Sequence, residues 1–179
     1  MLKIMKRGKG VEQLNELMNH MKSKPNSFVR TTFIAGHPGE TKEDFEALCN
    51  YVENFKFDRA NVFSYSDEEG TTAETRTDKV DQELIDERAE VLGEIISLTT
   101  QESLENEVGK TFEVYIDGES EEHEYLLSAR KTIWAPSIDG EIYINDNELS
   151  EGEQIKFGQI YTVKVTELVG DKLLATVIK

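Results

Sequence analysis

The sequence predicts a chain of two parts, an α/β segment followed by an all-β segment. Up to about residue 107, stretches with helical spacing of apolar residues alternate with short β-branched runs. From residue 108 onward the apolar residues follow a period of two, and five short strands fit into the remaining sequence. Such closely spaced strands are typical of a small antiparallel barrel. We therefore predict two domains, residues 1–107 and 108–179.

The first domain is predicted to hold two strands, Phe28–Ala35 and Arg59–Tyr65, among three helices at about residues 11–21, 42–55 and 78–105. Short connections between alternating helices and strands are typical of a parallel α/β fold. Two strands are too few for a parallel sheet that is buried on both faces. We therefore expect this domain to belong to a larger fold.

Each predicted helix has an apolar face at helical spacing. Thr41 precedes the second helix and can cap it, and the acids Glu43 and Asp44 suit the positive end of the helix dipole. The apolar stripe of the first helix is Val11, Leu14, Leu17, Met18 and Met21. The second helix is expected to bury Phe45, Leu48, Cys49, Val52 and Phe55. The third is expected to bury Val80, Leu84, Val91, Leu92, Ile95 and Ile96.

The second domain is predicted to be a barrel of five short strands. Gly170 and Asp171 separate the last two strands and suit a two-residue hairpin turn with glycine first. The predicted strands are Thr111–Asp117, Glu124–Arg130, Glu141–Asn145, Ile160–Leu168 and Lys172–Ile178.

The chain of 179 residues is strongly acidic, with a formal net charge of −16. Residues 108–179 carry 14 Asp and Glu against 7 Lys and Arg. An acidic surface repels phosphate backbones and attracts basic proteins, although it also serves solubility. No apolar run approaches the roughly 18 residues of a membrane helix, and a single cysteine excludes an internal disulfide framework. We expect a cytoplasmic protein with no membrane partner.

Few residues could catalyse a reaction alone. The histidines His20, His37 and His123 lie far apart in the sequence and have no partner at metal-ligand spacing. Cys49 lies on the apolar face of a predicted helix, where a free cysteine usually packs as a small hydrophobe. We therefore expect no catalytic residue and no metal ligand in this chain.

The loop Gly36–Glu40 has the most chemical promise. It follows a predicted strand, at the end where parallel α/β folds place their ligands. Its two glycines and its proline make a stiff turn whose backbone can approach a flat ligand. A purely structural strand-to-helix turn is the simpler interpretation of so short a pattern. Ser66–Thr71 follows the second strand and should line the same face, although its acids are more often solvated than catalytic.

The run from Arg30 to Thr41, RTTFIAGHPGET, resembles the radical S-adenosylmethionine methylthiotransferases, whose usual version has an aromatic residue at the position of His37. The resemblance continues, in order along the chain, in LKIMKRG (Leu2–Gly8), DRANVFSYSDEEGTTA (Asp58–Ala73) and APSIDGEIYI (Ala135–Ile144). Ordered runs that spread over nearly the whole chain are far more specific than any one of them.

The resemblance implies the C-terminal part of a radical-SAM TIM-like (βα) barrel, followed by a TRAM domain, a small five-stranded antiparallel β-barrel. In this family the loop with two glycines and the following strand help to enclose S-adenosylmethionine. The positions that carry over to this cofactor pocket are Gly36, Pro38, Gly39, Glu40, Val62, Phe63 and Ser64.

The family also uses two four-iron, four-sulfur (4Fe-4S) clusters, each of which needs three cysteines. The single Cys49 cannot supply them, so we expect those cysteines upstream of Met1. In a full enzyme, reductive cleavage of S-adenosylmethionine would give a radical that abstracts a hydrogen from the substrate, and sulfur insertion and methylation would follow. We expect neither a bound cofactor nor turnover from this chain alone.

Two branches of the family compete. One modifies an adenosine in tRNA and commonly has an arginine where this chain has Glu68; the other methylthiolates the β-carbon of an aspartate in the twelfth small-subunit ribosomal protein. The segment Ala135–Gly140 resembles the second branch. An acidic TRAM domain also suits docking of a basic ribosomal protein and argues against strong nucleic-acid binding. We predict the ribosomal-protein branch; the alternatives are the tRNA branch and a stand-alone acidic protein-binding module.

Overall fold

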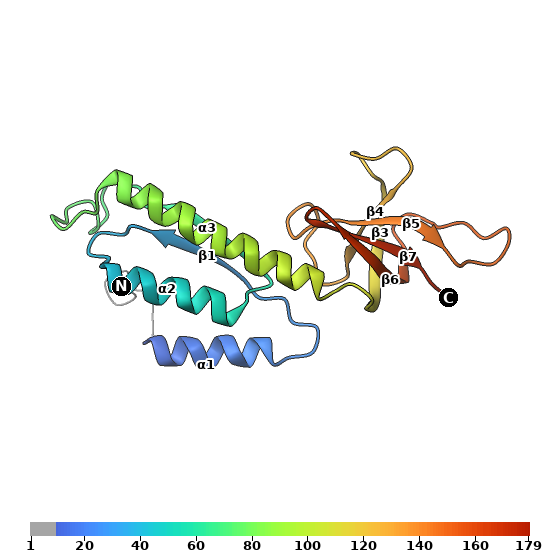
Figure 1. The fold of residues 1–179 in the computed structure, drawn as a ribbon, viewed down its shortest axis with the longest axis horizontal. Helices are drawn as coiled ribbons and strands as arrows, with labels where there is room; N and C mark the ends of the chain where they lie inside the picture. Colours follow the sequence, from blue (N-terminus) through green and yellow to red (C-terminus); the bar gives the residue numbers. More distant parts are fainter. Residues whose placement is uncertain (1–9) are drawn as a thin grey trace. The chain divides into compact units, whose positions relative to one another are not determined.

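The computed structural model describes residues 10–179, which contain three helices and seven strands (Figure 1). The chain divides into two compact units between Thr100 and Gln101. Of the runs that carry the sequence resemblance, Leu2–Gly8 lies outside the described residues and the others lie within them.

The first unit has helices and strands in the alternating order predicted. β1 and β2 pair in parallel, with Thr32 beside Asn61 and Ile34 beside Phe63, and α2 connects them. The elements are α1 (Val11–Lys22), β1 (Arg30–Ala35), α2 (Lys42–Phe55), β2 (Arg59–Ser64) and α3 (Gln82–Glu105), which continues past Thr100. The parallel pair with its connecting helix is a βαβ unit.

Local sequence explains where α2 begins and ends. The Asp44 N–H donates to the Thr41 hydroxyl at 3.1 Å, and the Asp44 carboxylate accepts a hydrogen bond from the Thr41 N–H at 3.2 Å. This capping box confirms the predicted cap. Lys56 follows the helix with a φ of 53°, a left-handed conformation that ends it.

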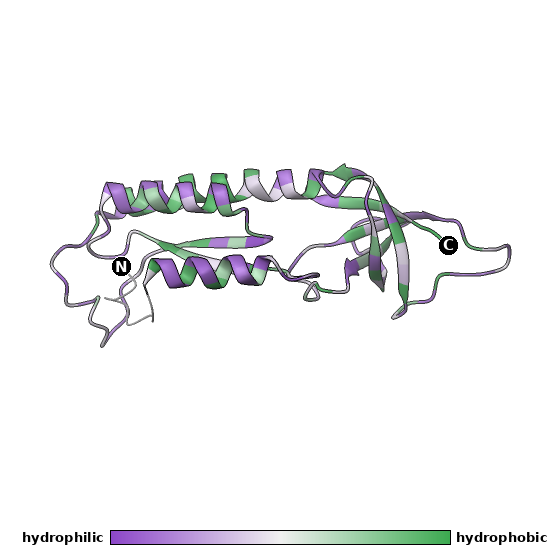
Figure 2. Cartoon of the chain, turned by 90° about the horizontal axis from the view of Figure 1, so that it is seen from below, coloured by the Kyte–Doolittle hydropathy of each residue, from purple (hydrophilic) through white to green (hydrophobic). Residues whose placement is uncertain are grey.

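The three helices and two strands share one apolar core, centred on Val29, Val52, Phe57, Ala60, Leu92 and Ile96. In Figure 2, hydrophobic and hydrophilic residues alternate along the long helix α3. The prediction that Leu84 and Val91 face inward is wrong, since they are 38% and 39% exposed. Leu92 is buried, as predicted, and Ile85 is buried as well, although it was not in the predicted stripe. Each pair is seven residues apart, so helical periodicity alone does not choose between them.

One face of the two-stranded sheet is exposed. Phe33 and Val62 pack against the core, whereas Ile34 and Phe63, the next residues along each strand, are exposed. Successive side chains of a strand point to opposite faces, so the face with Ile34 and Phe63 is the one turned away from the helices. A larger barrel would cover this face, and that barrel stays a prediction.

The second unit confirms the predicted barrel of five strands, which close in the order β3-β4-β5-β7-β6. The strands are β3 (Thr111–Glu119), β4 (Leu127–Lys131), β5 (Ile142–Asn147), β6 (Ile160–Val169) and β7 (Lys172–Val177). The apolar residues that fill the barrel are Val114, Ile116, Ala129, Ile142, Ile144, Val163, Val165, Leu173, Ala175 and Val177.

One pairing corrects the prediction of a wholly antiparallel barrel. β5 and β7 run parallel, with Ile142 beside Leu173, while the other pairings are antiparallel. Strand direction alternates between antiparallel neighbours, so a closed ring with an odd number of strands must contain a parallel pair. Gly170, with a φ of 64°, and Asp171 form the predicted turn between β6 and β7.

Candidate functional site

Two loops follow the carboxyl ends of β1 and β2 at the same edge of the sheet. Because the strands are parallel, Ala35 lies beside Ser64 where they end. The Tyr65 N–H donates to the Ala35 carbonyl at 2.8 Å and extends the pairing into the loops. Parallel α/β folds bind their ligands at this edge. The predicted pocket residues that lie at or directly after these strand ends are Gly36, Pro38, Gly39, Glu40 and Ser64.

Both glycines of the first loop have a backbone conformation that favours glycine, with φ values of 81° for Gly36 and 82° for Gly39. Both are also tightly packed. A Cβ atom on Gly36 would lie 2.9 Å from the Ile85 Cβ, and one on Gly39 would lie 2.6 Å from the Arg76 Nη2. The Gly39 N–H donates to the Asp78 carbonyl at 2.8 Å. The glycines therefore let the loop approach the start of α3 and the segment before it.

Glu40 forms a buried ion pair with Arg88 of α3. The Arg88 Nη1 lies 2.7 Å from the Glu40 Oε1, and the two side chains are 7% and 5% exposed. The same nitrogen donates to the Glu40 carbonyl at 3.1 Å. The Glu40 carboxylate also accepts the Gly36 N–H at 3.0 Å, which closes the loop on itself. In this structure Glu40 therefore holds the loop in place.

His37 and Pro38 form the buried middle of the loop. The His37 Nδ1 lies 2.9 Å from the Pro38 carbonyl, and because a carbonyl only accepts hydrogen bonds, Nδ1 is the donor. The His37 ring meets the Tyr65 ring edge to face, with the centroids 5.3 Å apart. The imidazole thus packs as an aromatic ring and connects the first loop to the second.

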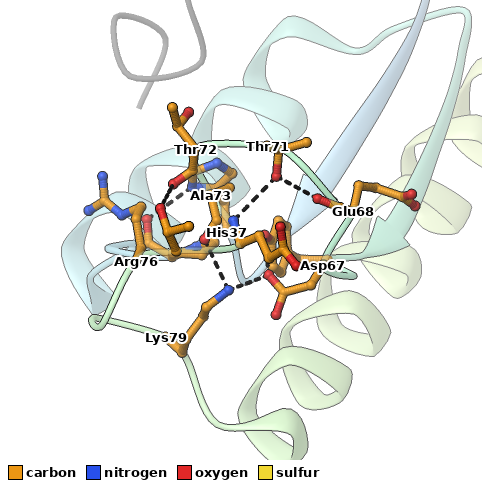
Figure 3. A network of polar contacts seen from close by, with 12 residues as sticks. His37, Asp67, Glu68, Thr71, Thr72, Ala73, Arg76 and Lys79 are labelled. Atoms are coloured by element: carbon orange, nitrogen blue, oxygen red, sulfur yellow. Dashed lines mark hydrogen bonds and ion pairs between the residues drawn. The ribbon is translucent and has the colours of Figure 1, made fainter.

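A network of polar contacts holds the loop after β2, as Figure 3 shows. Lys79 pairs with Asp67 and donates to the Ala73 carbonyl at 3.0 Å, and the Tyr65 hydroxyl donates to Asp67 at 2.7 Å. Hydrogen bonds from Lys79 and Tyr65 lower the pKa of Asp67. Burial, together with the hydrogen bond to Asp67, raises the pKa of Tyr65 to about 12. At neutral pH, Asp67 is therefore a carboxylate and Tyr65 a neutral phenol.

A hollow of about 550 Å³ lies beside this network. Its lining is Ser64, Tyr65, Ser66, Asp67, Lys79, Val80, Asp81, Gln82 and Ile85. Of the predicted residues of β2, Ser64 lines the hollow and donates to Asp86 at 3.1 Å, Val62 packs in the core, and Phe63 is 63% exposed. The lining offers hydroxyl, carboxylate and ammonium groups beside the apolar side chains of Val80 and Ile85.

The residues of this chain do not fit an iron–sulfur cluster. Among residues 10–179, no group of three His, Cys, Asp or Glu side chains could hold a metal ion. Cys49, the single cysteine, packs against the apolar core of the first unit, and burial raises the pKa of its thiol. A thiol that stays protonated is a poor ligand.

The barrel exposes acidic turns. Exposed acids lie at the end of β3, between β3 and β4, and between β5 and β6, namely Glu119, Glu121, Glu122, Glu124, Glu148, Glu151 and Glu153. Lys172 anchors the first turn, because its Nζ donates to Glu122 at 2.5 Å and to the Tyr143 hydroxyl at 2.7 Å. Three cations of the barrel pair with carboxylates: Arg130 with Asp117, Lys131 with Glu107, and Lys172 with Glu122. Trp134 is buried and is not a platform for stacking bases.

Sequence reasoning missed the side chains that hold the two loops. Arg88 is the most informative of them, because it occupies a position on the buried face of α3 between Ile85 and Leu92. An arginine at an apolar position of a helix is almost never buried unless it is paired, so this pattern is a signal for a buried carboxylate. The signal does not say which carboxylate is the partner.

The barrel belongs to a known class of domain. Residues 108–178 match the model of the TRAM domain, so the closed barrel is a TRAM domain. Among the described residues, the helices are too short or too polar to cross a membrane.

The whole chain is also similar to several known proteins that share one name. It is 97% identical over 179 residues to the ribosomal protein uS12 methylthiotransferase RimO of Aliarcobacter butzleri. It is 58% identical over 178 residues to the protein of that name in a Sulfurovum species, and 44% identical over 179 residues to that of Campylobacter jejuni. These matches cover 99% or more of this chain and 40% of each relative. The predicted resemblance is confirmed: over its whole length the chain is similar to part of the RimO proteins.

Proposed function

We propose that this chain is part of an enzyme that methylthiolates the β-carbon of an aspartate in ribosomal protein uS12. The proposal rests mainly on the similarity to RimO proteins over the whole chain, since their name gives both the activity and the protein target. The chain spans about two fifths of the length of these relatives, so the activity belongs to a complete enzyme. A ribosomal-protein target implies a cytoplasmic enzyme.

The chain would contribute one wall of the S-adenosylmethionine pocket. Gly36, Pro38, Gly39 and Glu40 would form it together with the end of β2, from Val62 to Ser64. The hollow beside Ser64 supports this proposal, because its hydroxyl and charged groups suit the amino-acid part of such a ligand. The exposed ring of Phe63 suits an adenine base.

When bound, S-adenosylmethionine supplies the radical and the methyl group of the reaction. The residues of this chain bind and orient, because its single cysteine cannot hold the clusters that generate a radical. Glu40 with Arg88 fixes one loop, and Asp67 with Lys79 fixes the other. The radical-SAM barrel that would complete the pocket is part of this proposal.

The TRAM domain would dock the basic ribosomal protein. Many of its exposed acids lie at two turns, and Arg130, Lys131 and Lys172 are engaged by the carboxylates of Asp117, Glu107 and Glu122. A surface with this charge steers a cationic protein toward it and repels the phosphates of RNA. We therefore propose a protein partner and no strong nucleic-acid binding.

The test joins this chain to the remaining part of the Aliarcobacter butzleri enzyme. The complete protein, with reconstituted clusters, is incubated with purified uS12 and with tRNA, and the products are analysed by mass spectrometry. We expect a methylthio group on one aspartate of uS12 and none on tRNA. A modified adenosine in tRNA would assign the chain to the other branch. No product, under conditions in which the unaltered Aliarcobacter enzyme is active, would favour a stand-alone protein-binding module.

A further inference from the structure

The first turns of α3 hold both loops of the candidate site. Ile85 packs against Gly36, and Asp86 accepts a hydrogen bond from Ser64. Arg88, at the end of the same turn, binds Glu40. Loops that follow two different strands are therefore fixed by one short stretch of helix.

We propose that Arg88 is a positioning residue for the cofactor pocket. Through Glu40 it fixes the loop Gly36–Glu40 against α3 and so sets the position of the pocket wall. The inference rests on the proposed function, in which this loop faces S-adenosylmethionine. Arg88 itself acts through Glu40 and needs no contact with the ligand.

The geometry of the Arg88 side chain carries the proposal. One nitrogen, Nη1, donates to the Glu40 Oε1 at 2.7 Å and to the Glu40 carbonyl at 3.1 Å, so it holds both the side chain and the backbone of the loop. The Arg88 guanidinium also lies 5.3 Å from the centre of the Phe45 ring of α2. The loop is thereby tied to two helices through a single side chain.

The burial of the pair indicates what it contributes. Both side chains are at least nine-tenths buried, so solvent screens their attraction little. Burying two charges is costly, and replacing such a pair by neutral groups is often neutral or stabilising. Removing one partner is destabilising, because the other charge stays buried without a counterion. A buried pair at a pocket loop is therefore better explained by the geometry that it enforces than by stability.

Removing one charge of the pair and removing both should affect stability differently, so a comparison of single and double variants separates a positioning role of the pair from a stabilising one. Arg88→Met and Glu40→Gln each leave a charge or a polar group without its partner, whereas the double variant removes both charges. The glutamine introduced by Glu40→Gln can still accept the Gly36 N–H, so the double variant keeps the closure of the loop and removes the connections that Arg88 makes to α3 and α2. Glu90→Gln, at an exposed position of the same helix, is the matched control.

The first measurement uses this chain alone. We expect Arg88→Met to lower the melting temperature and the double variant to recover most of that loss. The amides of Gly36, His37, Gly39 and Glu40 should exchange with solvent roughly tenfold faster in both, because the connection to α3 is absent in both. Glu90→Gln should change neither quantity. A double variant with normal exchange in the loop would show that the pair does not position it.

The second measurement uses the complete enzyme described above, with the same variants. The double variant should raise the KM for S-adenosylmethionine by roughly tenfold with little change in kcat, as expected when binding common to ground and transition state is weakened. An unchanged KM would overturn the proposal. If the unaltered complete enzyme does not modify uS12, the proposed function fails, and the exchange rates of residues 36–40 still decide whether Arg88 holds the loop.

Discussion

Gly36 and Ile85 lie so close together that a Cβ atom added to Gly36 would sit 2.9 Å from the Ile85 Cβ. Gly70 has nearly the same φ, 77° against 81°, but apart from Gly70 and its two chain neighbours no atom of the described residues lies within 4 Å of an added Cβ there. The two glycines therefore separate the cost of a left-handed backbone from the cost of a steric clash.

We expect Gly70→Ala to lower the free energy of unfolding by about 1–2 kcal/mol, the cost of a left-handed conformation for an L-residue. Gly36→Ala should lose about 1–3 kcal/mol more, because Ile85 and the backbone must shift to admit the methyl group. Urea unfolding followed by the circular dichroism of the helices measures both. Equal losses for the two variants would mean that the loop moves away from α3 at no cost.

The ion pairs of Glu107 should make the stability of the second unit depend on pH. Burial raises the pKa of Glu107, but its hydrogen bonds and charge interactions with Lys131 and Lys110 outweigh burial and hold the pKa below its ordinary 4.5. A lowered folded-state pKa stabilises the fold above the unfolded-state pKa, and this contribution is lost as the pH falls through the folded-state value. Glu107→Gln should therefore destabilise the chain at neutral pH and matter progressively less below pH 4.5.

Thermal unfolding of the unaltered chain and of Glu107→Gln, at neutral pH and in acid, tests this expectation. The two melting temperatures should converge as the pH falls. Glu113→Gln, which removes an exposed carboxylate of β3, is the control. If the melting temperatures of Glu107→Gln and the unaltered chain differ by the same amount in acid as at neutral pH, the ion pair is not the cause of the difference.

Hydrogen exchange should distinguish the two units. β1 and β2 form a two-stranded sheet with an exposed face, whereas β3 to β7 form a closed barrel around a buried apolar core. Closure leaves no unpaired edge, and a buried core protects amides from opening. We expect the amides of the barrel strands to exchange more slowly than those of β1 and β2. The reverse order would identify the first unit as the more stable one.

The elements of both units could be predicted from local sequence, because capping at Thr41, the glycine-first turn at Gly170 and the change of apolar period after residue 107 are local signals. Two features of the fold could not. The parallel pairing of β5 with β7 follows from closure of the ring, which no local pattern encodes. The face that α3 buries depends on tertiary packing, because Leu84 and Ile85 both fit a helical stripe.

The candidate site was predicted only in part. The two glycines of the loop Gly36–Glu40 predicted a stiff turn with close backbone approach, and in the structure both glycines are closely packed. The partnership of Glu40 with Arg88 joins residues 48 positions apart, a pairing that a single sequence does not reveal. The roles of Val62, Phe63 and Ser64 toward a cofactor stay a prediction.

We propose that this chain serves an enzyme that acts on ribosomal protein uS12 and not on tRNA. The chain offers exposed acidic turns, and exposed charges are screened beyond about 10 Å at 0.1 M salt. Docking of a basic protein should therefore weaken as salt rises. Glu121→Gln with Glu124→Gln should weaken it further, mainly by slowing association.

The most direct measurement is the equilibrium binding of this chain to purified uS12 and to tRNA, each at low and at high salt. We expect binding to uS12 that weakens with salt and is reduced in the variant lacking the charges of Glu121 and Glu124, together with weak or no binding to tRNA. Tighter binding to tRNA than to uS12 would contradict it.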